Sequence, residues 1–163
     1  MSELVILVVE DEPEVRAEIV RDLATFTQRI RIDEAESVDD AEAAIADAVE
    51  SGDRIGLAVV DHRLPGRTGV DLLVALHDDP ATRAIRTVLI TGQAGHQDTI
   101  RAINEAGLDH YIAKPWDPDE LVAVAKRLLT DHVVESDLDP LAYVPELDAA
   151  RLLDHYGEGG SVE

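Results

Sequence analysis

The chain has 163 residues, 45% of them hydrophobic, and a formal net charge of −21, which suits one core-forming domain with a short addition. The acid excess disfavours nucleic acid as a partner, because a phosphate backbone would be repelled over most of the surface. The chain has no cysteine for disulfides or thiolate sites and no apolar run long enough to cross a bilayer, so we expect a cytoplasmic protein with no membrane partner.

Apolar strands and amphipathic helices alternate from residue 4 to about residue 130. The first run, LVILVVE at residues 4–10, is typical of a strand buried on both faces of a parallel sheet. Helical spacing of apolar residues follows at residues 14–26. The segment IRIDEAES at residues 30–37 is a weaker strand candidate, and a second helix is predicted over residues 38–50.

The next two pairs repeat this order. A strand is predicted at residues 55–61 and a short helix at residues 70–77. Residues 86–91, RTVLIT, predict the fourth strand, and residues 99–106 predict a helix whose two isoleucines face inward.

The fifth pair carries the clearest helix start. HYIAK at residues 110–114 predicts a strand, and residues 117–129 predict a helix with Asp117 as its cap, Pro118 at its first position and Glu120 three residues after the cap. This regular alternation predicts an α/β fold with a doubly wound parallel sheet, helices on both faces and right-handed crossovers.

Residues 131–163 differ in character, so we place a domain boundary near residue 130. This segment holds nine acids and one base, Arg151, and only residues 144–156 have helical spacing. We interpret it as an acidic linker, one amphipathic helix and a flexible glycine-containing tail. The apolar face of that helix needs a partner, which is the main domain, a second copy or a segment outside this chain.

The residues that end the predicted strands are unusual in type. The first strand ends in Glu10 and Asp11, the third in Asp61, the fourth in Thr91 and the fifth in Lys114. Ligands of open α/β sheets bind outside the carboxyl ends of the strands, near the point where the strand order reverses. If the first and third strands are neighbours, these five side chains converge at one edge of the sheet.

Together these side chains suit phosphoryl transfer. Three close carboxylates repel one another, and an oxygen-rich cluster of this kind suits Mg²⁺. Asp61 can then accept a phosphoryl group as an acyl phosphate, while Lys114 and Thr91 contact the phosphoryl oxygens. Taken singly, Asp11 also fits a helix cap, Thr91 a turn and Lys114 a solvated strand end, so the ordered set supports this hypothesis more than any one member.

The chain resembles the receiver domain of two-component response regulators over residues 3 to about 130. The motifs that carry the resemblance are VVEDE, DHRLPGRTGVDLL, LITG and AGLDHYIAKPW, in that order. The resemblance implies a flavodoxin-like (βα)5 fold with strand order 2-1-3-4-5. It also implies a signalling protein and not an enzyme, apart from limited self-phosphorylation and autodephosphorylation.

The resemblance assigns roles to the strand-end residues. Asp61 would accept the phosphoryl group from a histidine kinase or phosphotransfer protein. Glu10, Asp11, Asp61 and the backbone carbonyl of Arg63 would bind Mg²⁺, with Asp11 closer than Glu10. Lys114 would contact the phosphoryl group.

The resemblance also implies a conformational switch. Thr91 would move towards the phosphoryl group, and Tyr111 would turn inward into the space that it leaves. The bond between Lys114 and Pro115 is expected to be cis. The surface of the fourth helix, fifth strand and fifth helix would then signal to an output partner or domain, which the sequence does not identify. A homodimer through that surface or through the C-terminal helix is a further alternative.

Two positions beside the expected site bear on the lifetime of the phosphate. Arg63 and Gln93 lie two residues after Asp61 and Thr91, where they would flank the path of attacking water. Arg63 also disfavours a phosphatase of the haloacid dehalogenase type, because that chemistry needs an acid at this position. A receiver-like module that takes no phosphate is the other alternative, which the complete residue set disfavours. We interpret the six histidines as surface or helix-end residues.

Overall fold

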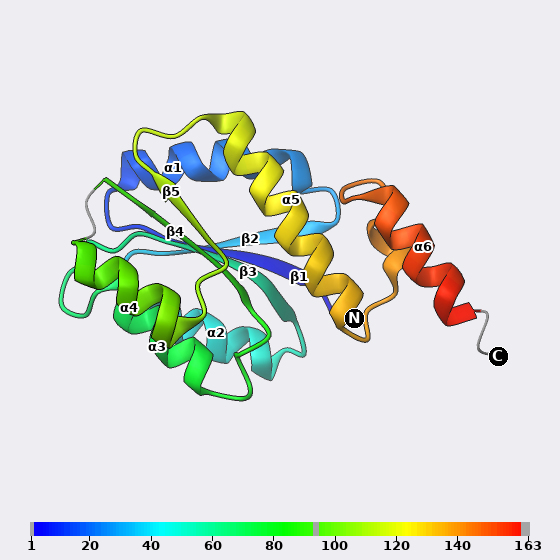
Figure 1. Ribbon diagram of the computed structural model, residues 1–163, viewed down its shortest axis with the longest axis horizontal. Helices are drawn as coiled ribbons and strands as arrows, with labels where there is room; N and C mark the ends of the chain where they lie inside the picture. Colours follow the sequence, from blue (N-terminus) through cyan, green and yellow to red (C-terminus); the bar gives the residue numbers. More distant parts are fainter. Residues whose placement is uncertain (1, 93–94, 161–163) are drawn as a thin grey trace.

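The computed structural model describes residues 2–92 and 95–160 of the chain. Within these ranges, five parallel strands form one sheet in the order β2-β1-β3-β4-β5 (Figure 1). The strands are β1 (Leu4–Val9), β2 (Ile30–Ala35), β3 (Arg54–Val60), β4 (Arg86–Thr91) and β5 (His110–Ala113). The sheet confirms the predicted fold class and strand order.

Helices cover both faces of this sheet. They are α1 (Pro13–Asp22), α2 (Val38–Glu50), α3 (Gly69–Asp78), α4 (His96–Ala106) and α5 (Pro118–Glu135), with α6 (Ala149–Gly160) and the 3₁₀ turns η1 (Leu23–Phe26) and η2 (Pro140–Tyr143). Figure 1 shows α1 and α5 over one face and α2, α3 and α4 over the other. All six residues of β1 are buried, because the strand lies inside the sheet and contributes to the apolar cores on both faces.

The helix α4 faces the core differently from the prediction. Ile100 and Ile103 are 42% and 56% exposed, so the expectation that they face inward is wrong. Ala102 and Ala106 are buried instead, in the same core as Leu73 of α3. Small side chains at these positions allow α4 to lie close to α3, which leaves the isoleucine stripe on the surface.

Two other predicted helices have different bounds. The helix predicted over residues 14–26 becomes α1 followed by the 3₁₀ turn η1, which still buries Phe26. The helix predicted over residues 117–129 continues as α5 to Glu135. Its start agrees with the prediction, because the Asp117 side chain caps the Asp119 amide and Pro118 follows.

The C-terminal segment packs onto the main domain. Tyr143, Leu147 and Leu152 are buried in the core that lies under α1 and α5. The Thr130 hydroxyl, on α5, accepts a 3.2 Å hydrogen bond from the amide of Asp148, which directly precedes α6, so this bond also connects α5 with α6. Of the three partners considered for the apolar face, the main domain is therefore the one that the structure shows.

The predicted bounds of this last helix need correction. The helix begins at Ala149 and not at residue 144, because the residues before it form η2 and a turn. It continues through the glycines at its end to Gly160, where a flexible tail was predicted. The rest of that predicted tail, residues 161–163, lies outside the described residues.

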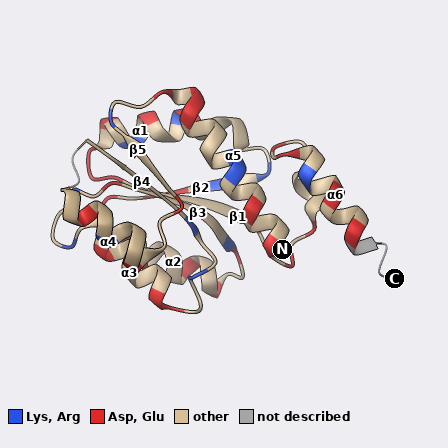
Figure 2. Ribbon diagram, viewed as in Figure 1, with Lys and Arg blue, Asp and Glu red and all other residues tan. Residues whose placement is uncertain are grey.

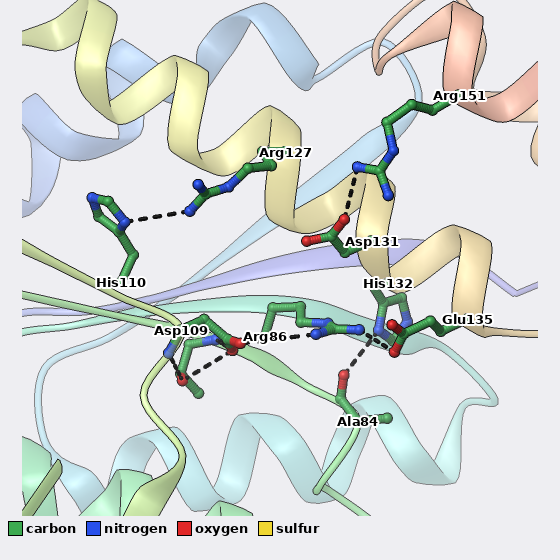
Figure 3. A network of polar contacts seen from close by, with 10 residues as sticks. Ala84, Arg86, Asp109, His110, Arg127, Asp131, His132, Glu135 and Arg151 are labelled. Carbon is green, nitrogen blue, oxygen red and sulfur yellow. Dashed lines mark hydrogen bonds and ion pairs between the residues drawn. The ribbon is translucent and has the colours of Figure 1, made fainter. Parts of the chain in front are cut away.

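A polar network fastens the end of α5 to the start of β4 (Figure 3). Arg86 forms ion pairs with Asp109 and Glu135, and His132 Nδ1 lies 3.1 Å from the Ala84 carbonyl oxygen. His132 is only 5% exposed, and it lies in the last turn of α5, so it is a helix-end residue as interpreted, although a buried one. Burial lowers its pKa, and the nearby Arg86 and Arg54 lower it further.

Charge is spread over the whole molecule. Figure 2 shows acidic residues on all six helices, with short, scattered basic segments between them. In the described part of the chain, no helix combines the length and hydropathy needed to cross a membrane.

Candidate functional site

The ends of four strands meet at one edge of the sheet. The Asp61 amide donates a 2.9 Å hydrogen bond to the Val9 carbonyl, so the residues that follow β1 and β3 lie side by side. The Lys114 amide donates a 3.1 Å bond to the carbonyl of Thr91, which joins the ends of β4 and β5 in the same way. This edge includes the reversal of strand order between β1 and β3, as expected for a ligand site in this architecture.

Three carboxylates form a cluster at this edge. One oxygen each from Glu10, Asp11 and Asp61 lies within 4.8 Å of the other two. Glu10 is fully buried and Asp61 is 4% exposed, whereas Asp11 is open to solvent. Lys114 enters the cluster from β5, with its ammonium 3.0 Å from Glu10 Oε2 and 3.3 Å from Asp61 Oδ2.

The cluster shifts the titration of its members. Burial is the main cause that raises the pKa of Glu10 to about 7, and the nearby Asp61 adds to it while Lys114 opposes it. Burial alone would lower the pKa of Lys114, but the hydrogen bond with Glu10 and the charges of Asp61 and Glu10 together raise it. The lysine therefore stays charged, while proton binding at Glu10 occurs near neutral pH.

Two oxygens of the cluster lack a protein partner. Among the described residues, Glu10 Oε1 and Asp61 Oδ1 are buried and accept no hydrogen bond. Buried oxygens without a partner are costly, and a hard cation with oxygen preference would satisfy them. The donor set, three carboxylates with one exposed member, therefore fits a divalent cation such as Mg²⁺.

The loop after Asp61 is shaped by glycine. A Cβ atom on Gly69 would lie 2.0 Å from the Asp61 carbonyl oxygen, so only glycine allows α3 to start this close to the cluster. The Gly69 amide donates a 2.9 Å hydrogen bond to the His62 carbonyl, which closes the loop. Gly66 has a φ of 80°, in the left-handed region that favours glycine.

Three of the predicted site residues line an open pocket of about 890 Å³ beside the cluster. Asp11, Arg63 and Tyr111 line it, with Arg63 exposed and Tyr111 half-buried. Thr91 is 1% exposed at the end of β4. Gln93 lies outside the described residues. The peptide bond between Lys114 and the following proline is cis, which confirms that prediction.

The sequence did not single out two residues that support the site. Arg16, on α1, donates a 2.8 Å hydrogen bond to the Glu10 carbonyl and forms an ion pair with Glu34. His62 is 9% exposed, which corrects its interpretation as a surface residue, and its Nε2 lies 3.3 Å from Asp98 Oδ2. No spacing pattern links these partners, because each contact joins separate elements.

Comparison with known proteins gives consistent matches. The family described as "Response regulator receiver domain" matches residues 6–126. The hydrogenase transcriptional regulatory protein HoxA of Cupriavidus necator is 29% identical over 136 residues, which cover 83% of this chain and 26% of HoxA. The phosphate regulon transcriptional regulatory protein PhoB of Escherichia coli is 32% identical over 148 residues, which cover 85% of this chain and 61% of PhoB.

A solved structure shows the same architecture. The CheY-like response regulator receiver domain protein of Methanospirillum hungatei superposes with a TM-score of 0.70 at 25% sequence identity, covering 83% of this chain and all of that one. The chain thus spans about a quarter of HoxA and less than two thirds of PhoB.

Proposed function

The chain belongs to the response regulator receiver family, and on this basis we propose that it accepts a phosphoryl group on Asp61 from a histidine kinase or phosphotransfer protein. The observation that carries this proposal is the environment of the Asp61 carboxylate. Its Oδ2 faces the Lys114 ammonium at 3.3 Å, while its Oδ1 is buried and has no partner among the described residues. The carboxylate is thus held beside a positive charge that would also attract an incoming phosphoryl group, and one of its oxygens has no protein partner among the described residues.

The proposed reaction transfers a phosphoryl group between two side chains. An Asp61 oxygen forms a bond to phosphorus as the bond from phosphorus to the donor imidazole nitrogen breaks, and the imidazole keeps the electron pair and takes up a proton. Lys114 compensates the negative charge on the phosphoryl oxygens. The protein contributes mainly positioning and charge, since this chemistry needs little else.

We propose that Glu10, Asp11, Asp61 and the backbone carbonyl of Arg63 hold Mg²⁺ for this reaction. Bound there, the ion supplies positive charge that screens the carboxylates from an incoming phosphoryl group. The partnerless oxygens of Glu10 and Asp61 support this assignment.

Thr91 and Tyr111 are the proposed switch residues. Thr91 is the last residue of β4, the neighbour of the strand β3 that leads to Asp61, and its hydroxyl moves towards the phosphoryl oxygens once they are present. Tyr111 lines the pocket and turns inward as Thr91 leaves its place. The face formed by α4, β5 and α5 passes the change to an output partner, with Ile100 and Ile103 exposed on it.

We further propose that Arg63 and Gln93 set the lifetime of the phosphate by flanking the path of attacking water. Arg63 lines the pocket beside the cluster, which supports its part of this proposal.

The C-terminal segment is proposed to be an appendage of the receiver and not a separate domain, since its buried residues belong to the receiver core. The named relatives are transcriptional regulatory proteins longer than this chain, so the output of this protein is a separate question. A homodimer through the α4-β5-α5 face or through α6 stays a proposal.

Acetyl phosphate is the simplest test of the proposed reaction, because it needs no cognate kinase. With Mg²⁺ present, the wild-type chain is expected to gain one phosphoryl group by intact-mass analysis. The Asp61→Ala variant is expected to gain none, and equal labelling of both proteins would reject the proposal.

A further inference from the structure

The first turn of α4 lacks the usual cap. Its N-cap residue is Gly95, which offers no side chain, and Asp98 stands at the third helical position. An acid at that position commonly folds back onto the N-cap amide, as Asp71 does with Thr68 at the start of α3. In α4 the Asp98 carboxylate instead reaches His62, with Oδ2 3.3 Å from His62 Nε2.

A second contact lies one turn further along the same helix. Arg101 Nη1 lies 2.8 Å from Asp71 Oδ1 on α3. Residues three apart share a helix face, so Asp98 and Arg101 both point towards the segment that follows Asp61. In the first contact α4 supplies the acid, and in the second it supplies the base. The two pairs therefore fix the position of α4 along this segment.

The His62 side chain depends on this contact for its orientation. It is 11% exposed, whereas the Asp98 side chain is 46% exposed. Its Nδ1 is buried without a hydrogen-bond partner among the described residues, so Asp98 is the side chain that holds the ring. Both residues line the pocket beside the carboxylate cluster, and His62 directly follows Asp61.

We propose that His62 and Asp98 are positioning residues that hold the first turn of α4 in the unphosphorylated chain and release it on phosphorylation. This inference rests on the proposed phosphorylation of Asp61. A phosphoryl group there adds between one and two negative charges to a pocket that already contains the Asp98 carboxylate. Repulsion between these charges weakens the contact and favours a displaced first turn of α4.

Hydrogen exchange of the α4 amides tests both halves of this proposal. In the unphosphorylated chain, Asp98→Ala and His62→Ala are expected to speed exchange in the first turns of α4 by about fivefold, the worth of one polar contact near the surface. Asp98→Asn keeps an oxygen in the place that faces His62 Nε2, so its exchange is expected to match that of wild type. Adding Asp98→Ala to His62→Ala should cause no further increase, since the contact is already lost.

The second half concerns the response to acetyl phosphate and Mg²⁺. Phosphorylation is expected to speed α4 exchange in wild type and much less in Asp98→Asn, because the amide has no charge to be repelled. A control is Asp39→Ala, which removes an exposed acid from the first turn of α2. It should leave α4 exchange unchanged with and without phosphorylation.

Three results would overturn parts of this account. If Asp98→Ala speeds exchange equally with and without His62, the contact does not hold α4. If Asp98→Asn responds to phosphorylation as wild type does, charge repulsion is not the cause of release. If neither wild type nor any variant that keeps Asp61 gains a phosphoryl group, the proposed function fails. Exchange in the unphosphorylated proteins then still decides whether the contact holds α4.

Discussion

The Lys114 ammonium lies 3.0 Å from Glu10 Oε2, although the two residues are 104 positions apart in the sequence. The sheet produces this contact, because β1 and β5 both end at the edge where the carboxylates gather. Even so, the lysine does not fully compensate the buried carboxylate, and the pKa of Glu10 is raised to about 7. The site therefore has a titrating group within the physiological pH range.

Cation binding is expected to weaken as the pH falls through this value. The raised pKa means that Glu10 carries a proton below about pH 7, and Mg²⁺ must displace it. The Kd for Mg²⁺ should rise towards about tenfold per pH unit on the acid side, measured by titration calorimetry. Glu10→Gln should bind more weakly with a shallower pH dependence, and an unchanged slope would mean that another group titrates.

Gly69 is expected to tolerate no side chain. The Cβ atom of Gly69→Ala would lie 2.0 Å from the Asp61 carbonyl oxygen, so the loop must shift at a cost of about 2–3 kcal/mol. Denaturant unfolding measures this loss, and Mg²⁺ affinity should fall with it. Gly157→Ala is the matched control, because an added methyl there meets no atom within 4 Å in the exposed last part of α6. Equal effects of the two changes would contradict the close approach.

The C-terminal helix is expected to share the stability of the receiver core. Leu152 is fully buried and the adjacent Leu153 is 50% exposed. Leu152→Ala should lower the free energy of unfolding by about 2–5 kcal/mol, and Leu153→Ala by less than about 0.5 kcal/mol. Urea unfolding of both variants compares the same Leu→Ala change at a buried position and at an exposed one. A small effect of Leu152→Ala would show that α6 does not fold with the receiver.

Acid is expected to destabilise the protein through His132. Its pKa is lowered in the folded state, mainly by burial, so its neutral form contributes stability that is fully present above the unfolded pKa of about 6.5. That contribution is lost as the pH falls below this value, because the unfolded chain binds the proton more readily. Thermal unfolding of wild type should therefore depend more steeply on pH below about 6.5 than that of His132→Gln.

The control for His132 is the exposed His96, whose replacement by Gln should leave this pH dependence unchanged. If His132→Gln retains the full wild-type slope, His132 is not the source of the acid sensitivity.

Much of the fold could be predicted from local pattern. The apolar run of β1 and the alternation after it indicate a parallel sheet, but periodicity does not give the order of the strands, which came from the family resemblance. The orientation of α4 shows a second limit. The isoleucine spacing of Ile100 and Ile103 defines a stripe, whereas burial is decided by how closely Ala102 and Ala106 approach α3.

The site was predictable where it depends on strand ends. Glu10, Asp61 and Lys114 each follow an apolar run, so their convergence could be inferred before any distance was known. The contact between His62 and Asp98 could not, because no repeat or spacing relates a loop residue to a helix start in another unit. The burial of His132 could have been predicted, since this residue follows the buried Leu128 of α5 by four positions.

The central claim is that Asp61 accepts a phosphoryl group, and one labelling measurement tests it most directly. The wild-type chain and Asp61→Ala are incubated with acetyl phosphate, with and without Mg²⁺, and the acid-labile phosphate is located by peptide mass spectrometry. The account predicts one acyl phosphate, on Asp61, formed only by the wild type and only with Mg²⁺. Undiminished labelling of Asp61→Ala, or no labelling of wild type, would contradict it.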